Sequence, residues 1–454
     1  MGFTGTEKII KRNLVRGEAV AGKQAVVTVD CLLTHDVCGP PTIGIFKREF
    51  GKNARVWDKN KVVIIPDHYI FTKDPTAARN VQVLRDFVAE QGIPNFYDVG
   101  TDRYSGVCHT TLLEKAHVLP GEILVGTDSH TTTASAIGAG AWGVGNTIGA
   151  FVMGSGYAIL NTPQTMSFVF DNQFPEYVMA KDVILRVIGD IGTDGADFKV
   201  LEFAGQGPLG LSLEQRTVLG NMAIEAGGNG FVAPDYKTRA YLNEKLSAIS
   251  DRERAERMLK KLKGIDFEEL QSDPDASFLS RHRYDSQSIE PMVAMPHSPG
   301  KVARAMDSKT VSLKSAYLGS CTGGNTEDFL AAARLLVAAG KQVAIPLYVV
   351  PATVGVLNFL NNRKIGDRTL RQIFQDSGAN MCSFDQPSCA ACLGGPVDTY
   401  GRINETQPHP RISTTNRNFP GRMGKTGEIY LASPLTVIAS ALKGRITDPR
   451  EFMS

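Results

Sequence analysis

The sequence lacks a large excess of charge of either sign. Lys and Arg together number 49 against 47 Asp and Glu, which leaves a formal net charge of +2 over 454 residues. A charge so close to balance excludes a global field that would draw in nucleic acid or an anionic membrane. Any anionic ligand must therefore meet positive charge that is local to its site.

Long apolar runs and abundant cysteines are also missing. No run approaches the ~20 apolar residues of a membrane-spanning helix, and the first residues do not form a secretion signal. We therefore expect an intracellular protein, placed in the cytoplasm, or in an organellar matrix or stroma if a leader has been removed. Seven cysteines are too few for a secreted disulfide framework, and in a reducing compartment clustered thiols indicate a metal site or catalysis instead.

The composition that is present is typical of globular proteins, with 42% apolar and 21% charged residues. Buried strands alternate with amphipathic helices, which predicts an α/β fold with mostly parallel sheets. Strands are predicted at residues 61–66, 122–126, 316–319 and 342–350, and helices at 76–91 and 327–339. Changes of pattern near residues 163 and 286 predict three domains, 1–162, 163–285 and 286–454.

Two other segments bear on the organisation. Ser212 begins a capping-box helix that we expect to run to about Ala226, with Asn221 and Glu225 four residues apart on one face. The densely charged residues 239–269 are interpreted as a solvated surface helix or insertion. No internal repeat is visible, which argues against a solenoid.

Reactive residues follow three of the predicted strands. Asp67 and His68 follow the first, residues 128–130 (Asp-Ser-His) the second, and Cys321 the strand at 316–319. Taken singly, a neighbouring acid and histidine are more often a structural hydrogen-bonded pair than a catalyst. Because ligands of open α/β sheets bind beyond the carboxyl ends of the strands, three such positions together favour a functional site.

The cysteines indicate a metal more strongly. Cys389 and Cys392 form a C-x-x-C pair, and Cys321 lies where a helix start would stabilise a thiolate. Structural zinc needs a fourth ligand, for which Cys382 has no partner motif, and a thioredoxin-like redox pair lacks its usual context. Three thiolates suit a 4Fe-4S cluster with one open iron, a Lewis acid that binds a hydroxyl and a carboxylate.

Residues 413–423 concentrate amides, hydroxyls and two arginines. Asn416, Arg417 and Arg422 lie within this segment. Arginine forks match carboxylates bidentately, so the segment is a candidate for binding an organic acid. The alternative is a pair of ordinary surface ion pairs.

Five motifs give the sequence a family resemblance. They are residues 34–40 (Thr-His-Asp-Val-Cys-Gly-Pro), 126–131 (Gly-Thr-Asp-Ser-His-Thr), 319–324 (Gly-Ser-Cys-Thr-Gly-Gly), 388–394 (Ser-Cys-Ala-Ala-Cys-Leu-Gly) and 415–422 (Thr-Asn-Arg-Asn-Phe-Pro-Gly-Arg). From about residue 6 to the C-terminus the chain resembles the aconitase superfamily. Within it, the chain is similar to the large subunits of 3-isopropylmalate dehydratases, also called isopropylmalate isomerases.

The resemblance implies three related α/β domains around a central 4Fe-4S cluster. It implies that Cys321, Cys389 and Cys392 hold one cluster per subunit, with one iron not ligated by cysteine. Cys31, Cys38, Cys108 and Cys382 are left without that role.

The resemblance also implies the residues that act on the substrate. Three acid–histidine pairs would surround it, with His68 as the acid for the leaving hydroxyl: Asp67 with His68, Asp128 with His109, and Glu225 with His130. His35 and Ser129 would be polar neighbours of the substrate, Asn221 and Asn416 would lie near the cluster, and Arg417 and Arg422 would hold carboxylates.

The implied activity is that of a hydro-lyase in leucine biosynthesis, which interconverts 2-isopropylmalate and 3-isopropylmalate through 2-isopropylmaleate. Full-length aconitases carry a further swivelling domain with the base serine, whereas this sequence stops at Ser454. We therefore expect a separate small subunit that carries this domain, with no nucleic acid or membrane partner. Large subunits of homoaconitase, methylthioalkylmalate isomerase and dimethylmalate dehydratase are the alternatives.

Two rival classes remain at this stage. A cluster-free relative of aconitase binds RNA, but the balanced charge argues against this role. A plain electron-transfer module would be expected to have four cysteine ligands rather than three.

Overall fold

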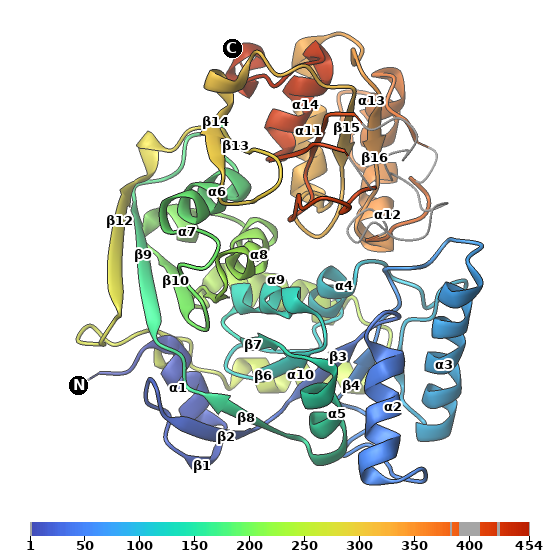
Figure 1. Cartoon of the computed structure of the whole chain (residues 1–454), viewed down its shortest axis with the longest axis vertical. Coiled ribbons are helices and arrows are strands. Elements are labelled where there is room, and N and C mark those ends of the chain that lie inside the picture. The colour runs from blue at the N-terminus through green and yellow to red at the C-terminus, as the bar shows by residue number, and fades with distance from the viewer. Residues whose placement is uncertain (1, 382–383, 390–408, 425–426, 454) are drawn as a thin grey trace.

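The computed structural model describes residues 2–381, 384–389, 409–424 and 427–453 (Figure 1). Helices alternate with strands along the chain, and three large sheets of mostly parallel strands organise it. The predicted α/β fold is confirmed. Each large sheet lies within one of the three predicted domain ranges, whose boundaries stay a prediction. Among the described helices, none is long and apolar enough to cross a membrane.

The first sheet has the order β5-β4-β3-β6-β7, with all its strands parallel, and it occupies the lower part of Figure 1. Its strands are β3 (Cys31–Thr34), β4 (Val62–Ile64), β5 (Asn95–Phe96), β6 (Ile123–Gly126) and β7 (Gly140–Gly143). The helices of this region are α1 (Gly5–Arg12), α2 (Gly39–Phe50), α3 (Pro75–Gln91), α4 (Cys108–Glu114) and α5 (Asn146–Ser155). Helix α3 starts at Pro75 because Asp74 caps the N–H groups of Thr76 and Ala77, and proline at N1 needs no N–H partner.

A small antiparallel sheet adjoins this region at the lower rim of the molecule (Figure 1). It has the order β1-β2-β8 and consists of β1 (Leu14–Gly17), β2 (Gln24–Thr28) and β8 (Tyr157–Asn161).

The second sheet has the order β11-β10-β9-β12 and is also parallel throughout. Its strands are β9 (Thr165–Asp171), β10 (Val200–Ala204), β11 (Asn229–Phe231) and β12 (Ser280–Asp285). Its helices are α6 (Ala180–Ile191), α7 (Gln206–Gly210) and α8 (Leu213–Met222), the last continued by the 3-10 turn η2 (Ala223–Ala226). The helix predicted after Ser212 is present, and the Ser212 hydroxyl accepts the Gln215 N–H, but the Gln215 side chain accepts the Ala180 N–H instead of completing a capping box, and the last turn is tighter than α.

The charged residues 239–269 form two helices, α9 (Tyr236–Ser247) and α10 (Arg252–Lys263). Their charged outer face is solvated, as predicted, with the Glu253 and Arg257 side chains exposed. Their apolar residues Leu242, Leu246 and Leu262 are buried in the hydrophobic core of the first sheet. The segment is thus a cover for that core, because helices with one apolar face bury it against a neighbouring layer.

The third sheet has the order β14-β13-β20-β19-β15-β16, parallel from β20 to β16 and antiparallel at β13 and β14. Its strands are β13 (Met292–Ala294), β14 (Val302–Arg304), β15 (Ser315–Leu318), β16 (Leu347–Val349), β19 (Arg411–Ser413) and β20 (Ile429–Ala432). Its helices are α11 (Thr326–Ala339), α12 (Val354–Asn362), α13 (Leu370–Asp376) and α14 (Pro434–Lys443), and the hairpin β17 (Lys364–Ile365) and β18 (Arg368–Thr369) joins α12 to α13. The strand predicted at 342–350 is shortened to β16, because Pro346 has no N–H for the ladder.

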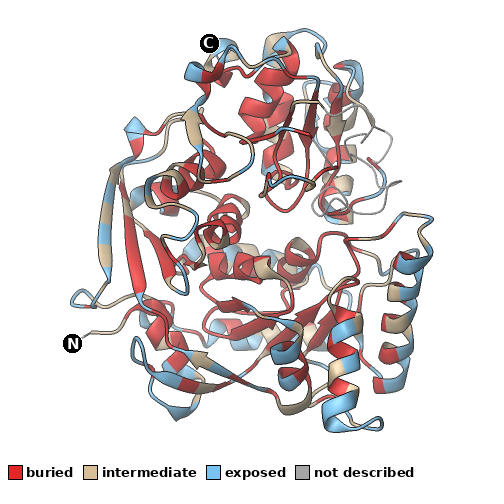
Figure 2. Ribbon diagram, viewed as in Figure 1, coloured by how far each residue is buried: buried red, intermediate tan, exposed pale blue. Residues whose placement is uncertain are grey.

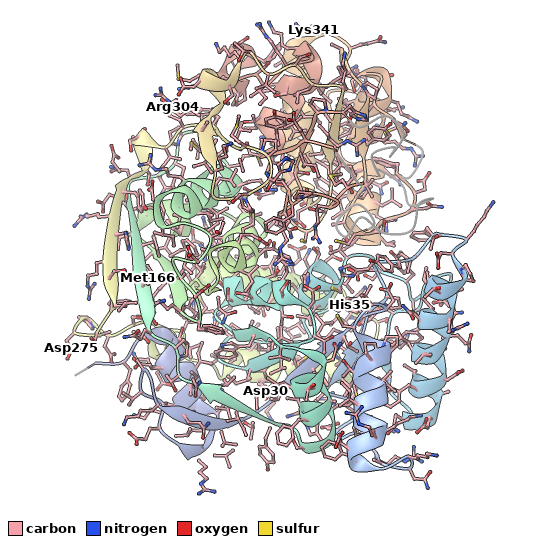
Figure 3. All side chains as sticks on the ribbon, viewed as in Figure 1. Asp30, His35, Met166, Asp275, Arg304 and Lys341 are labelled. Atoms are coloured by element: carbon pink, nitrogen blue, oxygen red, sulfur yellow. The ribbon has the colours of Figure 1, made fainter. Side chains whose placement is uncertain are left out.

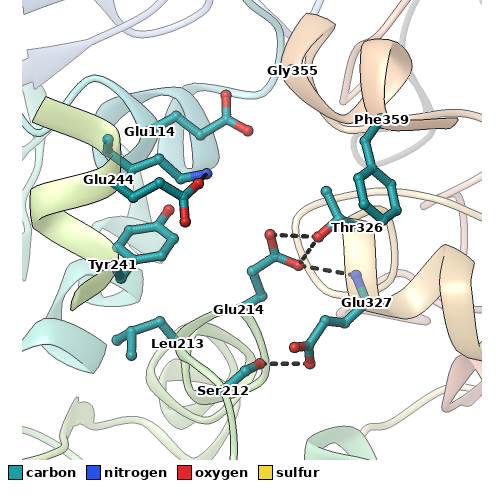
Figure 4. A pocket seen from close by; sticks show the side chains of 11 residues that line it. Glu114, Ser212, Leu213, Glu214, Tyr241, Glu244, Thr326, Glu327, Gly355 and Phe359 are labelled. Atoms are coloured by element: carbon teal, nitrogen blue, oxygen red, sulfur yellow. Dashed lines mark hydrogen bonds and ion pairs between the residues drawn. The ribbon is translucent and has the colours of Figure 1, made fainter. Parts of the chain in front are cut away.

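A cavity of about 570 Å³ lies where α4, α8, α9, α11 and α12 meet (Figure 4). Glu214 of α8 accepts the Thr326 hydroxyl at 2.7 Å and the Glu327 N–H at 3.0 Å, both at the start of α11. Glu114 of α4 accepts the Thr353 hydroxyl at 2.8 Å, just before α12. Carboxylates at helix N-termini are stabilising. The hydrogen bonds of Glu114 and Glu214 around this cavity therefore help to hold the third sheet region against the first and second.

Candidate active site

The strand ends of the first and third sheets meet in the interior of the molecule. Figure 2 shows buried residues on both sides of this meeting, and Figure 3 marks His35 there, beyond the end of β3. Direct contacts join the two sides, because the Cys389 N–H donates to the Asp67 carbonyl at 3.0 Å and the Val107 N–H to the Ala352 carbonyl at 2.8 Å. The reactive residues thus lie beyond the carboxyl ends of parallel strands, as predicted.

The loop after β4 holds His68 in a fixed orientation. Its Nδ1 lies 2.6 Å from Oδ1 of Asp67, and both side chains are buried. The carboxylate of Asp36 accepts the backbone N–H groups of Asp67, His68 and Tyr69, which pins the loop. Burial opposes protonation of His68, but the Asp67 carboxylate outweighs it and raises the pKa of this imidazole. His68 is therefore oriented and disposed to carry a proton.

Asp128, just after β6, is the centre of a group of imidazoles. Its Oδ1 lies 2.9 Å from Nε2 of His109 and 3.5 Å from Nδ1 of His130. Its Oδ2 lies 3.5 Å from Nε2 of His35 and 3.8 Å from Nε2 of His68. Burial would raise the pKa of Asp128, but His109 and its other partners hold the pKa well below its usual range. The family resemblance implied only that Asp128 pairs with His109. The structure shows that the same carboxylate also lies near the imidazoles of His35, His68 and His130.

Glu225 of η2 links His130 to an arginine. Its Oε1 lies 2.8 Å from Nε2 of His130 and 2.8 Å from Nε of Arg417. Arg417 also donates to Oγ of Ser129 at 3.2 Å. Burial and Arg417 disfavour protonation of His130, but Asp128 and Glu225 outweigh them and raise its pKa to about 9. The predicted pair of Glu225 and His130 is present, and Arg417 is bound to it through Nε.

Two amide side chains point at the sulfur of Cys321, which lies in the loop after β15. Nδ2 of Asn221 is 3.3 Å from Sγ and Nδ2 of Asn416 is 3.5 Å from it. The same Asn416 amide donates to Oδ1 of Asn221 at 3.2 Å. Amide donors around a buried sulfur stabilise the thiolate that a metal needs.

Cys389 lies in the same apolar cluster as Cys321, together with Val107 and Ala352. Both thiol groups are buried, with 5% and 2% of the residue exposed. The third predicted ligand, Cys392, lies outside the described residues. The described cysteines suit the binding of a metal cluster. Both sulfurs are buried in one apolar group of residues, and amide N–H groups point at the sulfur of Cys321.

Arg422 has a buried Nε with no hydrogen-bond partner among the described residues. One of its other nitrogens, Nη2, donates weakly to Oδ1 of Asn416 at 3.4 Å. An unpaired buried donor lowers stability unless a ligand supplies the acceptor. This orphaned N–H group points to an anionic ligand such as a carboxylate.

Two further residues that support the site were missed from the sequence. Asp36 follows His35 at the end of β3, so the rule that located the other strand ends would have found it. Lys181 of α6 is 1% exposed, and its Nζ donates to Oγ1 of Thr322 at 3.0 Å and to the carbonyls of Thr414 and Thr415. It joins the loop of Cys321 to the segment of Asn416, and no local sequence signal reveals this tertiary role.

The other described cysteines are not members of the apolar cluster that contains Cys321 and Cys389. Cys31 is a core residue of β3, Cys38 precedes α2, and the Cys108 N–H donates to Asp67 at 2.7 Å. Burial raises the pKa of the Cys31 and Cys108 thiols, which disfavours the thiolate. Cys382 lies outside the described residues.

The site therefore has two halves. The histidine half consists of Asp67, His68, His109, Asp128 and His130 from the first sheet region. The cysteine half consists of Cys321, Cys389, Asn416 and Arg422 from the third sheet region. Buried imidazoles thus lie close to two buried sulfurs and an arginine, an arrangement that suits metal-assisted acid–base chemistry on an anion.

The chain belongs to the aconitase family: the model for the "Aconitase family (aconitate hydratase)" matches residues 7–444. This family implies a 4Fe-4S cluster, with which the cysteine half agrees.

Among named proteins, the "3-isopropylmalate dehydratase large subunit, chloroplastic" of Arabidopsis thaliana is 48% identical over 464 positions, covering 100% of this chain and 87% of that protein. The "Probable 3-isopropylmalate dehydratase large subunit" of Methanothermobacter thermautotrophicus is 40% identical and covers 99% of each chain. A solved structure, aconitase X of Thermococcus kodakaraensis, overlaps with a TM-score of 0.48 and 12% identity, covering 87% of this chain and 84% of that one. The family membership rests on the family model and the two named sequences.

Proposed function

We propose that this chain is the large-subunit component of a hydro-lyase that interconverts 2-isopropylmalate and 3-isopropylmalate through 2-isopropylmaleate, a step in leucine biosynthesis. The observation that carries the proposal is that the histidine half and the cysteine half lie together, joined by the contact of Cys389 with Asp67. The names of the relatives that match over the full chain support the same activity. The location that we propose is the cytoplasm, or an organellar matrix or stroma after loss of a leader.

His68 gives the proton to the departing hydroxyl group of the substrate. When the C–O bond breaks, the hydroxyl leaves with its electron pair and needs a proton to become water. His68 suits this step because Asp67 orients its Nδ1 at 2.6 Å and favours the protonated ring. In the return direction the same imidazole takes the proton from water as the hydroxyl adds to the neighbouring carbon.

Arg422 and Arg417 hold the two carboxylates of the substrate. The buried Nε of Arg422 has no partner among the described residues, so a carboxylate would complete its hydrogen bonding. Arg417 keeps Nε on Glu225 and reaches Ser129 with a second nitrogen, which places it beside His130. The guanidinium forks favour a carboxylate ligand, although the charge of Arg417 is already paired with Glu225.

Cys321, Cys389 and Cys392 are proposed as the cluster ligands, with Asn221 and Asn416 as donors to the Cys321 sulfur. When bound, a 4Fe-4S cluster with one iron not ligated by cysteine supplies a Lewis acid that makes the substrate hydroxyl a better leaving group. Of these ligands, the described Cys389 donates its backbone N–H to the carbonyl of Asp67, next to His68, and Cys321 shares an apolar cluster with it.

The base that removes the proton next to the carboxylate is proposed to come from a separate small subunit. Among the described side chains of the site, the carboxylates of Asp67, Asp128 and Glu225 are all bound to imidazoles, and the Ser129 hydroxyl contacts both His130 and Arg417. The relatives are named large subunits, which implies such a partner.

Activity assays of the purified chain, with and without its small subunit, test the proposal. We expect the chain alone to hold the cluster and turn over poorly, and the pair to convert 2-isopropylmalate. A panel that adds citrate and homocitrate-derived acids separates isopropylmalate from the substrates of related enzymes. Full activity of the chain alone, or preference of the pair for another acid, would contradict the proposal.

A further inference from the structure

The outer edge of β8 is bare. In the sheet order β1-β2-β8, only β2 pairs with β8 among the described strands. The Val29 N–H donates to the Gly156 carbonyl and the Thr162 N–H to the Lys23 carbonyl, so the even-numbered residues of this strand bond to β2. Backbone groups alternate along an antiparallel strand, so those of Tyr157, Ile159 and Asn161 point away from the sheet.

The segment of chain that contains this edge strand has no acidic or basic side chain other than His130. No Asp, Glu, Lys or Arg occurs between Asp128 and Asp171, a stretch that contains α5 and β8. Proteins usually protect exposed strand edges with charged side chains. The edge strand β12 follows that rule, because its exposed residues are Arg281, Arg283 and Asp285. In β8 the exposed residues are Tyr157, Ile159 and Asn161.

Apolar side chains continue this surface onto α5 and the end of α2. The members are between 42% and 52% exposed and comprise Phe50, Ile148, Phe151, Tyr157 and Ile159. The ring of Phe50 lies against Gly154 of α5, where a Cβ would come within 2.5 Å of it, so the two helices share the patch. At ~150–250 Å² for each large side chain, the patch exposes roughly 400 Å² of apolar surface. In a protein–protein interface of standard size, each partner buries ~800 Å² of surface. The exposed apolar area of the patch is about as large as the apolar share of that surface.

We propose that a second copy of this chain covers the patch, by antiparallel pairing of β8 with β8 across a two-fold axis. A two-fold interface must be complementary to itself, and an uncharged strand edge meets its own copy without repulsion. With Ile159 opposite Ile159 of the second copy, Tyr157 faces Asn161. The outward backbone groups of these residues then hydrogen-bond to each other, except the Tyr157 N–H, which donates to Oγ of Ser155 at 3.2 Å. The two small sheets then form one continuous sheet of six strands.

Sedimentation of the native chain, alone and with its small subunit, tests the pairing. We expect a particle with two chains of 49.1 kDa each, and a dissociation constant raised roughly 100-fold or more in Ile159→Lys, because two lysines meet at the axis. Leu279→Lys is the matched control, since Leu279 is a comparably exposed apolar residue beside the charged edge of β12 and should leave the dimer intact.

The register is tested with Ile159→Cys. Directly opposed, hydrogen-bonded residues have Cα atoms ~5.5 Å apart, within the range of a disulfide, so mild oxidation should cross-link this variant and not the native chain. A monomeric native chain, a dimer that survives Ile159→Lys, or a dimer of Ile159→Cys that does not cross-link would each overturn the proposal. Loss of the small subunit from Ile159→Lys, with the native chain alone monomeric, would assign the patch to that subunit instead and would also overturn it. None of these readouts depends on the proposed catalytic function.

Discussion

The histidine half and the cysteine half differ in how completely the protein satisfies their polar groups. In the histidine half, Asp67 and Asp128 hydrogen-bond to imidazoles at 2.6 and 2.9 Å, and Asp36 pins the loop of His68. Glu225 of η2 adds a bond to His130 at 2.8 Å, whereas Nε2 of the neighbouring His35 lacks a hydrogen-bond partner among the described residues. In the cysteine half, amides face the sulfur of Cys321 and the buried Nε of Arg422 lacks a partner among the described residues.

This difference indicates that the acid–base geometry is built before any ligand arrives, whereas the other half is built to receive one. Preorganised donors spare the reaction the reorganisation of the site. Unsatisfied donors are kept where a ligand will satisfy them. Variants that affect one half and leave the other intact therefore test whether the two halves act independently.

The largest effect is expected from Cys389→Ser. Loss of one of three thiolate ligands should abolish the brown cluster absorbance and the activity together, because serine is a poor ligand for iron–sulfur clusters. Absorption spectra and turnover of the two-subunit enzyme check this. Cys31→Ala, in the core of β3, should retain the absorbance. Retained turnover in Cys389→Ser would refute the role of the cluster.

His68→Gln should lower kcat/KM by about 10²–10⁴ while the cluster absorbance stays unchanged, because loss of a general acid typically has this effect. Steady-state kinetics and the spectrum of the same sample separate the two halves. His282→Gln is the matched control, since His282 stacks on Phe168 in the second sheet region. Loss of the cluster in His68→Gln would show that the halves are not independent.

Arg422→Lys should raise KM about 10–100-fold, the equivalent of the ~1.5–3 kcal/mol of one charge-assisted hydrogen bond. Lysine keeps the charge but not the guanidinium fork, so binding of a carboxylate weakens. Arg283→Lys, in an exposed ion pair with Asp171, should keep the native KM. An unchanged KM in Arg422→Lys would remove this residue from substrate binding.

The smallest effect concerns the cavity where the first and second sheet regions meet the third, and where Glu114 bonds to Thr353 (Figure 4). Burial raises the pKa of Glu114 to about 7 from 4.5, although Thr353 and Lys245 oppose this and Glu214 adds to it. Between these values the folded state holds a proton that the unfolded state has lost, so this carboxyl makes the free energy of unfolding fall as pH rises.

Glu114→Gln removes this contribution, so its free energy of unfolding should fall less steeply than that of the native protein between pH 4.5 and about 7. Denaturant titrations across this range measure the slopes. Glu244→Gln, on an exposed residue of the same cavity, should keep the native slope. Parallel curves for Glu114→Gln and the native protein would show that Glu114 does not titrate differently on folding.

Local signals predicted much of the fold and many of the site positions. Apolar runs located β4, β6 and β15, and the reactive residues after them do converge, because parallel strands end on one side of a sheet. The signal failed at residues 342–350, where Pro346 shortened the strand.

Tertiary contacts set the rest. Asp128 meets four imidazoles from separate segments, and Lys181 reaches three oxygens of the third region from a helix of the second. Neither arrangement has a local pattern. The pairing of Arg417 with Glu225 likewise depends on the packing of η2 against the segment after β19.

The most direct test follows 2-isopropylmalate by NMR in a preparation of this chain with its small subunit and intact cluster. Our account predicts that the alkene diacid 2-isopropylmaleate appears first and that 3-isopropylmalate then accumulates. Formation of 3-isopropylmalate with no alkene detected, or no conversion by a complex that retains its cluster, would contradict it.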